Sequence, residues 1–150
     1  MKSLFLLFLF ATWTSAEPAI RFGDRIAIIG NTFADQLRMH GYLETLLQRH
    51  SDLSIRNLGW AGDILTARDR PVGFPSEEAT LTEHKTDLVI ACFGMGESFE
   101  GDAGLPAFKA NLQNLISLHQ SKTYNGRSPA RVILVSPIAQ EDLEDYGNSH

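Results

Sequence analysis

The chain has 150 residues, a formal net charge of −5 and an apolar fraction of 43%. This length suits one domain with a sizeable hydrophobic core. The mild acidity, with no run of Lys and Arg, argues against nucleic acid as the main partner, because phosphate-binding surfaces carry clustered basic residues.

The N-terminus has the composition of a secretory signal peptide. Lys2 precedes an apolar run over residues 4–11, and small residues end at Ala16. This pattern predicts a signal peptide over 1–16, cleaved after Ala16, and a mature domain over 17–150 that is secreted or periplasmic. The run is too short to span a bilayer comfortably, so we expect no stable membrane span after cleavage. An uncleaved anchor is the alternative.

Short apolar runs then alternate with stretches in which apolar residues recur at helical spacing. In order they predict a strand over 25–30, a helix over 33–50, a strand over 53–59, a loop over 60–78, a short helix over 77–85, a strand over 86–94, a helix over 105–119 and a strand over 131–138. Gly41 weakens the first helix locally, Pro106 fits the first turn of the third, and Pro137 ends the last strand.

The only cysteine, Cys92, lies in the most apolar of these strands. An internal disulfide is therefore excluded. We expect the thiol to pack as a small hydrophobe in the core. A reactive or intermolecular thiol is the alternative.

The alternation of strands and helices predicts a three-layer α/β/α sandwich with a mainly parallel sheet. Ligands of such sheets bind at the carboxyl ends of the strands. The candidate site residues are therefore those that follow each strand: 30–33, 59–63, 94–98 and 136–138.

Thr32, in the stretch "GNTFAD", has two interpretations. It can be the N-cap of the following helix, with Asp35 three residues later completing a loose capping box. Such a cap contributes about 1 kcal/mol and needs no catalysis. Alternatively, Thr32 occupies the strand-to-helix break where a hydrolase carries its nucleophile.

The loops after the second and third strands are rich in glycine. "NLGWAGD" contains Gly59 and Gly62, and "FGMGESFEG" contains Gly96. Glycine lets a backbone N–H approach a ligand closely, as an oxyanion hole requires, although a tight turn explains these residues equally well. We expect these loops and Thr32 to form one pocket.

In this order, "GNT", "GWAGD" and "GMGE" resemble the first three sequence blocks of the SGNH hydrolase family, also called GDSL-type esterases, over about residues 26–138. A subgroup of SGNH-like domains in large secreted or membrane-associated bacterial proteins is also similar to this chain. The similar stretches are "GNTFADQL", "GYLETLL", "RNLGWAGD" and "ACFGMGES". The resemblance implies a flavodoxin-like sandwich, here expected to lack its last strand and helix. It also implies hydrolysis of an ester, with carbohydrate acetyl esters as one substrate class.

The resemblance places Thr32 at the nucleophile position, Gly62 at the oxyanion position and Gly96 at the position of the family's oxyanion Asn. Only Gly62 matches the family residue; Thr32 replaces Ser, Asn31 and Glu97 each replace Asp, and Gly96 replaces Asn. A threonine hydroxyl can attack an acyl group, although its methyl group stiffens χ1. Loss of one oxyanion donor lowers turnover on the order of 10²–10³.

The family's general base is the largest departure. The last block of the family is Asp-x-x-His, and no histidine of this chain follows an Asp at that spacing. A triad without its base loses on the order of 10⁴–10⁶ in rate. The activity is therefore expected to be reduced or lost unless a downstream His completes the site.

Three functions stay open. The first is an exported SGNH-type ester hydrolase acting on a small-molecule or glycan ester. The second is a non-catalytic SGNH-like module that binds a glycan or packs against other domains of a larger protein. The third is a flavodoxin-like binding domain without ester chemistry.

We expect no cofactor and no metal. "GMGESF" lacks the third glycine of a dinucleotide-binding fingerprint, because Phe99 stands there. The histidines lack metal-ligand spacing, and most of them are expected at the surface. Ser98 misses the nucleophile-elbow spacing by one residue.

Further residues bordering these positions can contact a substrate: Asn31, Trp60, Asp63 and Glu97. Trp60 can stack on a sugar ring or pack in the fold. Arg68 and Arg70 can meet an anionic substrate or remain solvated. The acidic stretch over 141–145 indicates a solvated surface or tail.

Overall fold

The computed structural model describes residues 17–49 and 52–138. Four strands form one parallel sheet in the order β2-β1-β3-β4. Their bounds are Arg25–Gly30 for β1, Ser54–Asn57 for β2, Leu88–Cys92 for β3 and Arg131–Val135 for β4. Outside the described residues lie the predicted signal peptide over 1–16, the acidic stretch over 141–145, His50 and His150.

The two central strands, β1 and β3, are buried along almost their whole length. Continuous apolar runs suit a parallel sheet because helices cover both of its faces. In the register, Ile28 of β1 lies beside Ile90 of β3, which in turn lies beside Ile133 of β4. This strand order matches the first four strands of the flavodoxin-like order 2-1-3-4-5, and the predicted α/β fold is confirmed.

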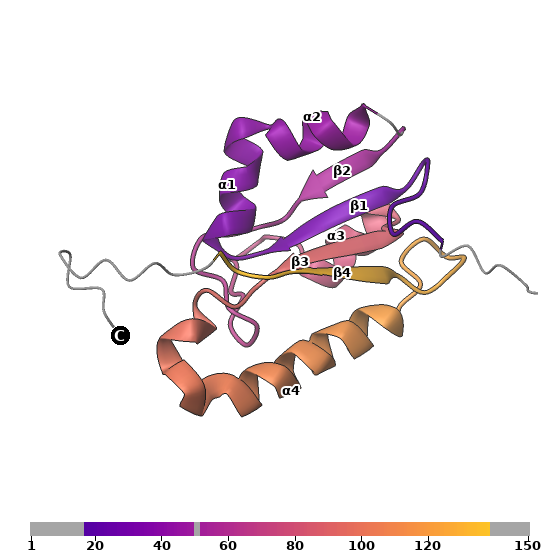
Figure 1. The fold of residues 1–150 in the computed structure, drawn as a ribbon. Coiled ribbons are helices and arrows are strands. Elements are labelled where there is room, and N and C mark those ends of the chain that lie inside the picture. Colours follow the sequence, from indigo (N-terminus) through magenta and orange to yellow (C-terminus); the bar gives the residue numbers. More distant parts are fainter. Residues whose placement is uncertain (1–16, 50–51, 139–150) are drawn as a thin grey trace, which may run out of the picture.

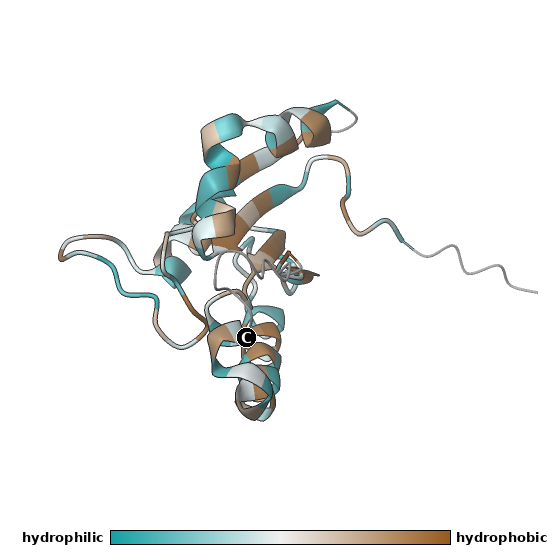
Figure 2. Cartoon of the chain, turned by 60° about the vertical axis from the view of Figure 1, so that its left-hand side comes forward, coloured by the Kyte–Doolittle hydropathy of each residue, from teal (hydrophilic) through white to brown (hydrophobic). Residues whose placement is uncertain are grey.

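Helices form a layer on each face of the sheet (Figure 1). They are α1 (Thr32–His40), α2 (Tyr42–Gln48), α3 (Glu77–His84) and α4 (Gly101–Gln120). α1 and α2 pack on the face that carries Ile26 and Ile28, whereas α3 and α4 pack on the face that carries Ala27 and Ile29. Alternate residues of β1 thus pack on opposite faces of the sheet. Figure 2 shows the apolar strand segments between the helical layers.

Two helices differ from their predicted bounds. The predicted helix over 33–50 is divided at Gly41, whose φ of 64° ends α1 because it lies in the left-handed region. α4 begins at Gly101, directly after the 3₁₀ helix η1 (Glu97–Glu100), so Pro106 lies inside the helix and not in its first turn. The residues before Pro106 are mostly small or polar, so apolar periodicity did not reveal this part of the helix.

The predicted cap of the first helix is wrong. Asn31, not Thr32, is the N-cap: its backbone is extended (φ −80°, ψ −159°), and its Oδ1 accepts a hydrogen bond from the Phe33 N–H at 3.0 Å. Asp35 pairs with Arg38 and closes no capping box. Thr32 is already the first helical residue, so its hydroxyl is not used for capping.

The chain after β2 stays attached to β1 beyond the end of the strand. The Leu58 N–H donates to the Ile28 carbonyl at 2.7 Å, and the Trp60 N–H donates to the Gly30 carbonyl at 3.0 Å. Because all four strands run parallel, the loops that follow them meet at one edge of the sheet. Within residues 17–49 and 52–138, no helix is long and apolar enough to cross a membrane.

Candidate functional site

The loops that follow the four strands enclose a cavity of about 530 Å³, which we call the Thr32 pocket. Thr32, Gly62 and Gly96 all line it, together with Asn31 and Asp63. Most of the remaining lining is apolar: Phe33, Ile64, Cys92, Phe93, Met95, Phe99, Val135, Pro137 and Ile138. The structure therefore brings these five residues, which follow three separate strands, into one largely apolar cavity. Of the other residues singled out in the sequence, Gly59, Trp60 and Glu97 do not line it.

Thr32 and Gly62 meet directly at this pocket. The Gly62 N–H donates a hydrogen bond to the Thr32 Oγ1 at 3.3 Å, and both residues are exposed to solvent. Gly62 has a φ of 87°, and an added Cβ would meet no atom within 4 Å. The backbone conformation, and not the available space, is therefore what favours glycine here.

Asn31 places Thr32 at the pocket. Its side chain is 6% exposed and caps α1, while its own N–H donates to the Cys92 carbonyl at 3.2 Å. Asn31 thus extends the pairing of β1 with β3 by one residue, and its side chain caps the helix that begins at Thr32. The Thr32 N–H lies at the first position of the helix, where the helix itself supplies no acceptor.

Gly96 stands at the position of the family's oxyanion Asn, and Ile64 lies beside it. Gly96 has an ordinary φ of −66°, but an added Cβ would lie 2.6 Å from the Ile64 Cγ2. Ile64 therefore fills the space that a longer side chain would need. The Glu97 carboxylate is bound within the fold and not to a ligand. Its two oxygens accept hydrogen bonds from the Leu65 N–H at 2.7 Å and the Gly94 N–H at 2.9 Å. It ties the loops after β2 and β3 together.

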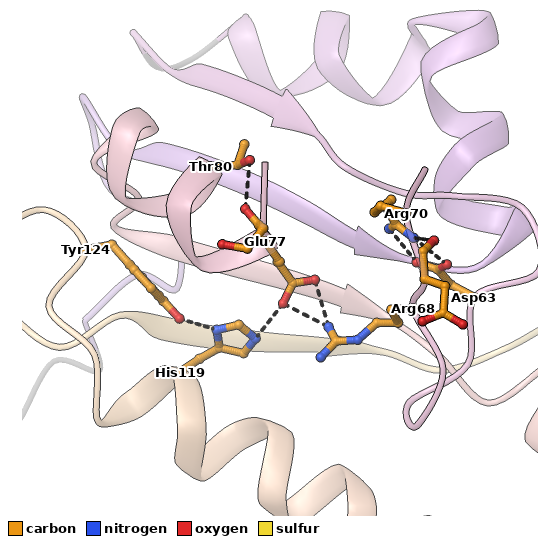
Figure 3. A network of polar contacts seen from close by, with 9 residues as sticks. Asp63, Arg68, Arg70, Glu77, Thr80, His119 and Tyr124 are labelled. Atoms are coloured by element: carbon orange, nitrogen blue, oxygen red, sulfur yellow. Dashed lines mark hydrogen bonds and ion pairs between the residues drawn. The ribbon is translucent and has the colours of Figure 1, made fainter. Parts of the chain in front are cut away.

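Asp63 also has a structural partner. It is 5% exposed, and its two oxygens accept hydrogen bonds from the two terminal nitrogens of Arg70 at 2.9 and 2.7 Å (Figure 3). This paired geometry is the strongest form of an Arg–carboxylate contact. The Asp63 carboxylate and the hydrogen bond to it raise the pKa of Arg70.

Trp60 does not line the Thr32 pocket. It lines a second cavity of about 640 Å³, which we call the Trp60 pocket, between the end of β2 and the loop that leads to α3. Arg68 and Arg70 line this cavity as well. Arg38 and Arg56 also line it, although neither stood out in the sequence, because single arginines on a helix and on an edge strand are ordinary surface residues.

A buried histidine network is a further feature that the sequence did not reveal. His119 of α4 is 1% exposed. The expectation that most histidines lie at the surface is therefore wrong for this residue. Its Nδ1 lies 2.9 Å from the Tyr124 hydroxyl, and its Nε2 lies 3.9 Å from a Glu77 oxygen (Figure 3). Glu77 in turn accepts hydrogen bonds from Arg68 at 2.9 and 2.8 Å.

Burial determines the protonation of this network. It lowers the pKa of His119 to about 4, with a smaller contribution from the nearby Arg68 charge, and raises the pKa of Tyr124 to about 12. Burial also raises the pKa of Glu77, against the effect of Arg68. The imidazole is therefore neutral at pH 7. It lines neither cavity, so it does not supply a base to Thr32.

Cys92 borders the Thr32 pocket but is chemically quiet. Burial raises the pKa of its thiol to about 11, so the sulfur stays protonated at neutral pH. Its side chain belongs to the core cluster formed with Ile28 and Ile90. The structure thus agrees with the predicted role of a small core hydrophobe.

Among the described residues, no histidine lines the Thr32 pocket. In the same part of the chain, no group of three or more His, Cys, Asp and Glu side chains is arranged to hold a metal ion. The groups of the described lining that can take part in chemistry include the hydroxyls of Thr32 and Ser136, the N–H at the start of α1 and the Gly62 N–H. Comparison of the chain with family models, curated proteins and solved structures gives no match.

Proposed function

We propose that this domain is an exported, SGNH-like ester-binding domain in which Thr32 is the acyl acceptor of a slow hydrolysis. The observation that carries the proposal is the Gly62 N–H directed at the Thr32 Oγ1, 3.3 Å away, at the mouth of an apolar cavity. A hydroxyl nucleophile and a backbone N–H donor, close together at the carboxyl edge of a parallel sheet, are two of the groups that acyl transfer uses.

In this mechanism the ester carbonyl lies against Thr32. The Thr32 Oγ1 attacks the carbonyl carbon, and the N–H groups of Thr32 and Gly62 donate to the developing oxyanion. The alcohol leaves with the proton that the Thr32 hydroxyl gave up, and water then adds to the acyl carbon, which releases the acid and restores the Thr32 hydroxyl. The hydroxyl proton passes to a base, which must come from a histidine outside the described residues or, less efficiently, from water.

The apolar lining of the pocket suits the acyl part of such an ester. Phe33, Phe99 and Met95 line the same cavity as the hydroxyl, and an acyl chain packed on them would displace water from the space beside Thr32. Hydrogen bonds to an oxyanion strengthen in a water-poor site. The proposed substrate is therefore an ester with a small or medium acyl group.

A second function is supported by a different observation. No imidazole lines the Thr32 pocket among the described residues, and Ile64 occupies the space of the second oxyanion donor. These features favour a module that binds an ester or a glycan, or packs against other domains of a larger protein, without cleaving a bond. The apolar pocket would then serve recognition alone.

An esterase assay on the exported chain separates these functions. p-Nitrophenyl acetate, p-nitrophenyl butyrate and acetylated xylan are the substrates, and Thr32→Ala, Thr32→Ser and Thr123→Ala are the first variants. Hydrolysis is expected in the parent, is expected to increase in Thr32→Ser because the obstructing methyl group is removed, and to fall to the blank in Thr32→Ala. The exposed Thr123, which does not line the pocket, is the matched control.

Restoring the family's second oxyanion donor completes the test. Gly96→Asn alone would collide with Ile64, so it is combined with Ile64→Ala. One added donor is expected to raise turnover on the order of 10²-fold. If neither the parent nor Thr32→Ser in this double background hydrolyses any ester, the hydrolase proposal fails and the binding module replaces it.

A further inference from the structure

The Trp60 pocket is lined by two aromatic side chains with exposed ring surface. Trp60 is 39% exposed and Phe74 is 55% exposed, and the rings meet edge to face with centroids 5.7 Å apart. The Arg70 guanidinium lies over the Trp60 ring, 4.9 Å from its centroid, and the bidentate pair with Asp63 holds it there. We call these two rings the aromatic platform; Arg70 packs on Trp60, and both rings keep part of their surface exposed to the open cavity.

The lining of this pocket contains more arginines than carboxylates. Four arginines line it, against two acidic residues, Asp69 and Glu77. Two of the arginines already have close partners: Arg68 binds Glu77, and Arg70 binds Asp63 (Figure 3). These pairs form part of the wall and leave little charge for a ligand.

The other two arginines differ from these. Arg38 pairs with Asp35 in an exposed contact on one turn of α1, of a kind that contributes little and exchanges readily with solvent. In residues 17–49 and 52–138, the Arg56 guanidinium makes no hydrogen bond or ion pair. A planar cationic group without a protein partner thus lines the same cavity as the aromatic platform.

We infer that the Trp60 pocket binds a sugar ring that carries a carboxylate. The apolar C–H face of a pyranose packs on exposed aromatic rings, and the carboxylate accepts two parallel hydrogen bonds from a guanidinium. Trp60 and Phe74 supply the first kind of contact, Arg56 supplies the second, and Arg38 adds a further donor. The side chain of Asn57, which also lines the pocket, donates to the Ala34 carbonyl and stiffens the floor.

The two pockets flank one loop. Trp60 lines one cavity, Gly62 lines the other, and the ion pair of Asp63 with Arg70 joins the two walls. A sugar held at Trp60 would therefore lie next to the loop that carries the Gly62 N–H. Together with the proposed function, on which this link rests, the arrangement identifies the substrate class as acyl esters of acidic glycans; the sugar site itself does not depend on hydrolysis.

Binding is measured with an unacylated ligand, so that no ester chemistry is needed. The probe is a galacturonic acid trisaccharide, and a neutral galactose trisaccharide is the control. The test uses the chain over 17–150, in which Trp60 is the only tryptophan. Calorimetry gives the dissociation constant, and Trp60 fluorescence reports whether the ligand reaches the platform.

Two arginine variants form a matched pair. Arg56→Gln is expected to weaken binding about tenfold or more, because a charge-assisted contact to the carboxylate is lost. Arg49→Gln removes the same charge from the exposed end of α2, outside the pocket lining, and is expected to leave the affinity unchanged. Phe74→Ala is expected to weaken binding several-fold. The dependence of the affinity on salt concentration is expected to stay almost unchanged, because the charged contacts are retained.

Four results would overturn the inference: no binding by the parent, equal binding of the neutral trisaccharide, equal weakening by the two arginine variants, or tighter binding of triglutamate, which would indicate an acidic peptide as the ligand. Binding of the acidic sugar without any ester hydrolysis would uphold this site and count against the proposed function. Hydrolysis that depends on Thr32, without binding of the acidic sugar, would do the reverse.

Discussion

Two glycines of the Thr32 pocket are required for opposite reasons. Gly62 has free space around its Cα but a φ of 87°, which a side chain makes costly. Gly96 has a φ that any residue adopts, but Ile64 occupies the space beside it. The N–H of Gly62 is directed at Thr32 because of its backbone conformation, so this glycine is tied to the proposed chemistry more closely than Gly96.

Replacement of Gly62 tests this distinction. We expect Gly62→Ala to lower the free energy of unfolding by about 1–2 kcal/mol, the cost of a Cβ in the left-handed region. We also expect it to reduce ester hydrolysis or ester binding. Urea unfolding and the esterase assay measure the two effects. Gly126→Ala is the control, since Gly126 has a φ of 70° and equally free space but lies outside the pocket. Equal functional loss in both variants would contradict a specific role of Gly62.

At the scale of elements, the junction of β1 with α1 determines where the candidate nucleophile lies. Asn31 is held by the last backbone contact to β3 and caps the helix with its side chain. The cap takes Asn31 and not Thr32 because only Asn31 has an extended backbone, and a side-chain cap must precede the first helical residue. The Thr32 hydroxyl is thereby left available to the Gly62 N–H.

This arrangement predicts different effects for two neighbouring substitutions. Asn31→Ala is expected to destabilise the domain by about 1 kcal/mol, as loss of a cap does, whereas Thr32→Ala is expected to change stability by less than about 0.5 kcal/mol. Ser76→Ala, which removes the cap of α3, is the matched control for Asn31→Ala. Thermal or urea unfolding measures all three. A larger loss in Thr32→Ala than in Asn31→Ala would restore Thr32 as the cap.

At the scale of the whole molecule, a buried polar network joins the second helical layer to the loop after β2. His119 and Tyr124 come from α4 and the turn behind it, Glu77 from α3 and Arg68 from the loop (Figure 3). Among buried side-chain atoms of the described residues, the His119 Nε2 lacks a hydrogen bond. A neutral buried imidazole couples the stability of the fold to pH, because it must become charged on unfolding at low pH.

The expected pH dependence has a definite sign. The pKa of His119 is about 4 in the folded chain and 6.5 in the unfolded chain, so the unfolded state binds more protons between these values. The contribution of His119 to stability is therefore complete above pH 6.5 and is lost as the pH falls toward 4, by about 2–3 kcal/mol at pH 4.5. Burial raises the pKa of Glu77, which acts with the opposite sign.

A comparison with His119→Gln isolates this contribution, because Glu77 and His84, whose pKa is also lowered by burial, are present in both proteins. The free energies of unfolding of the parent and the variant, measured in urea from pH 7.5 to 4.5, are expected to converge as the pH falls. Parallel curves would show that the imidazole titrates alike in the folded and the unfolded chain.

Local patterns in the sequence predicted the fold well, but not the partners of individual side chains. The apolar runs of β1 and β3 and the helical spacing around Leu112 and Leu115 carry their signal within a few residues. The start of α4 carried no such signal, and Gly41 divided a helix whose apolar spacing continues on both sides. The polarity of Asp63 and Glu97 indicated a site, whereas in the structure both carboxylates have partners in the fold.

By itself, the sequence determined the class of the fold and the sheet edge at which a ligand can bind, because strand and helix periods are local and parallel strands place their following loops together. Only the tertiary structure decided which loop residues share a cavity. It joined Thr32 to Gly62, thirty positions later in the chain, filled the space at Gly96 with Ile64, and placed Trp60 in a second pocket. Such contacts depend on distances between segments that no local pattern encodes.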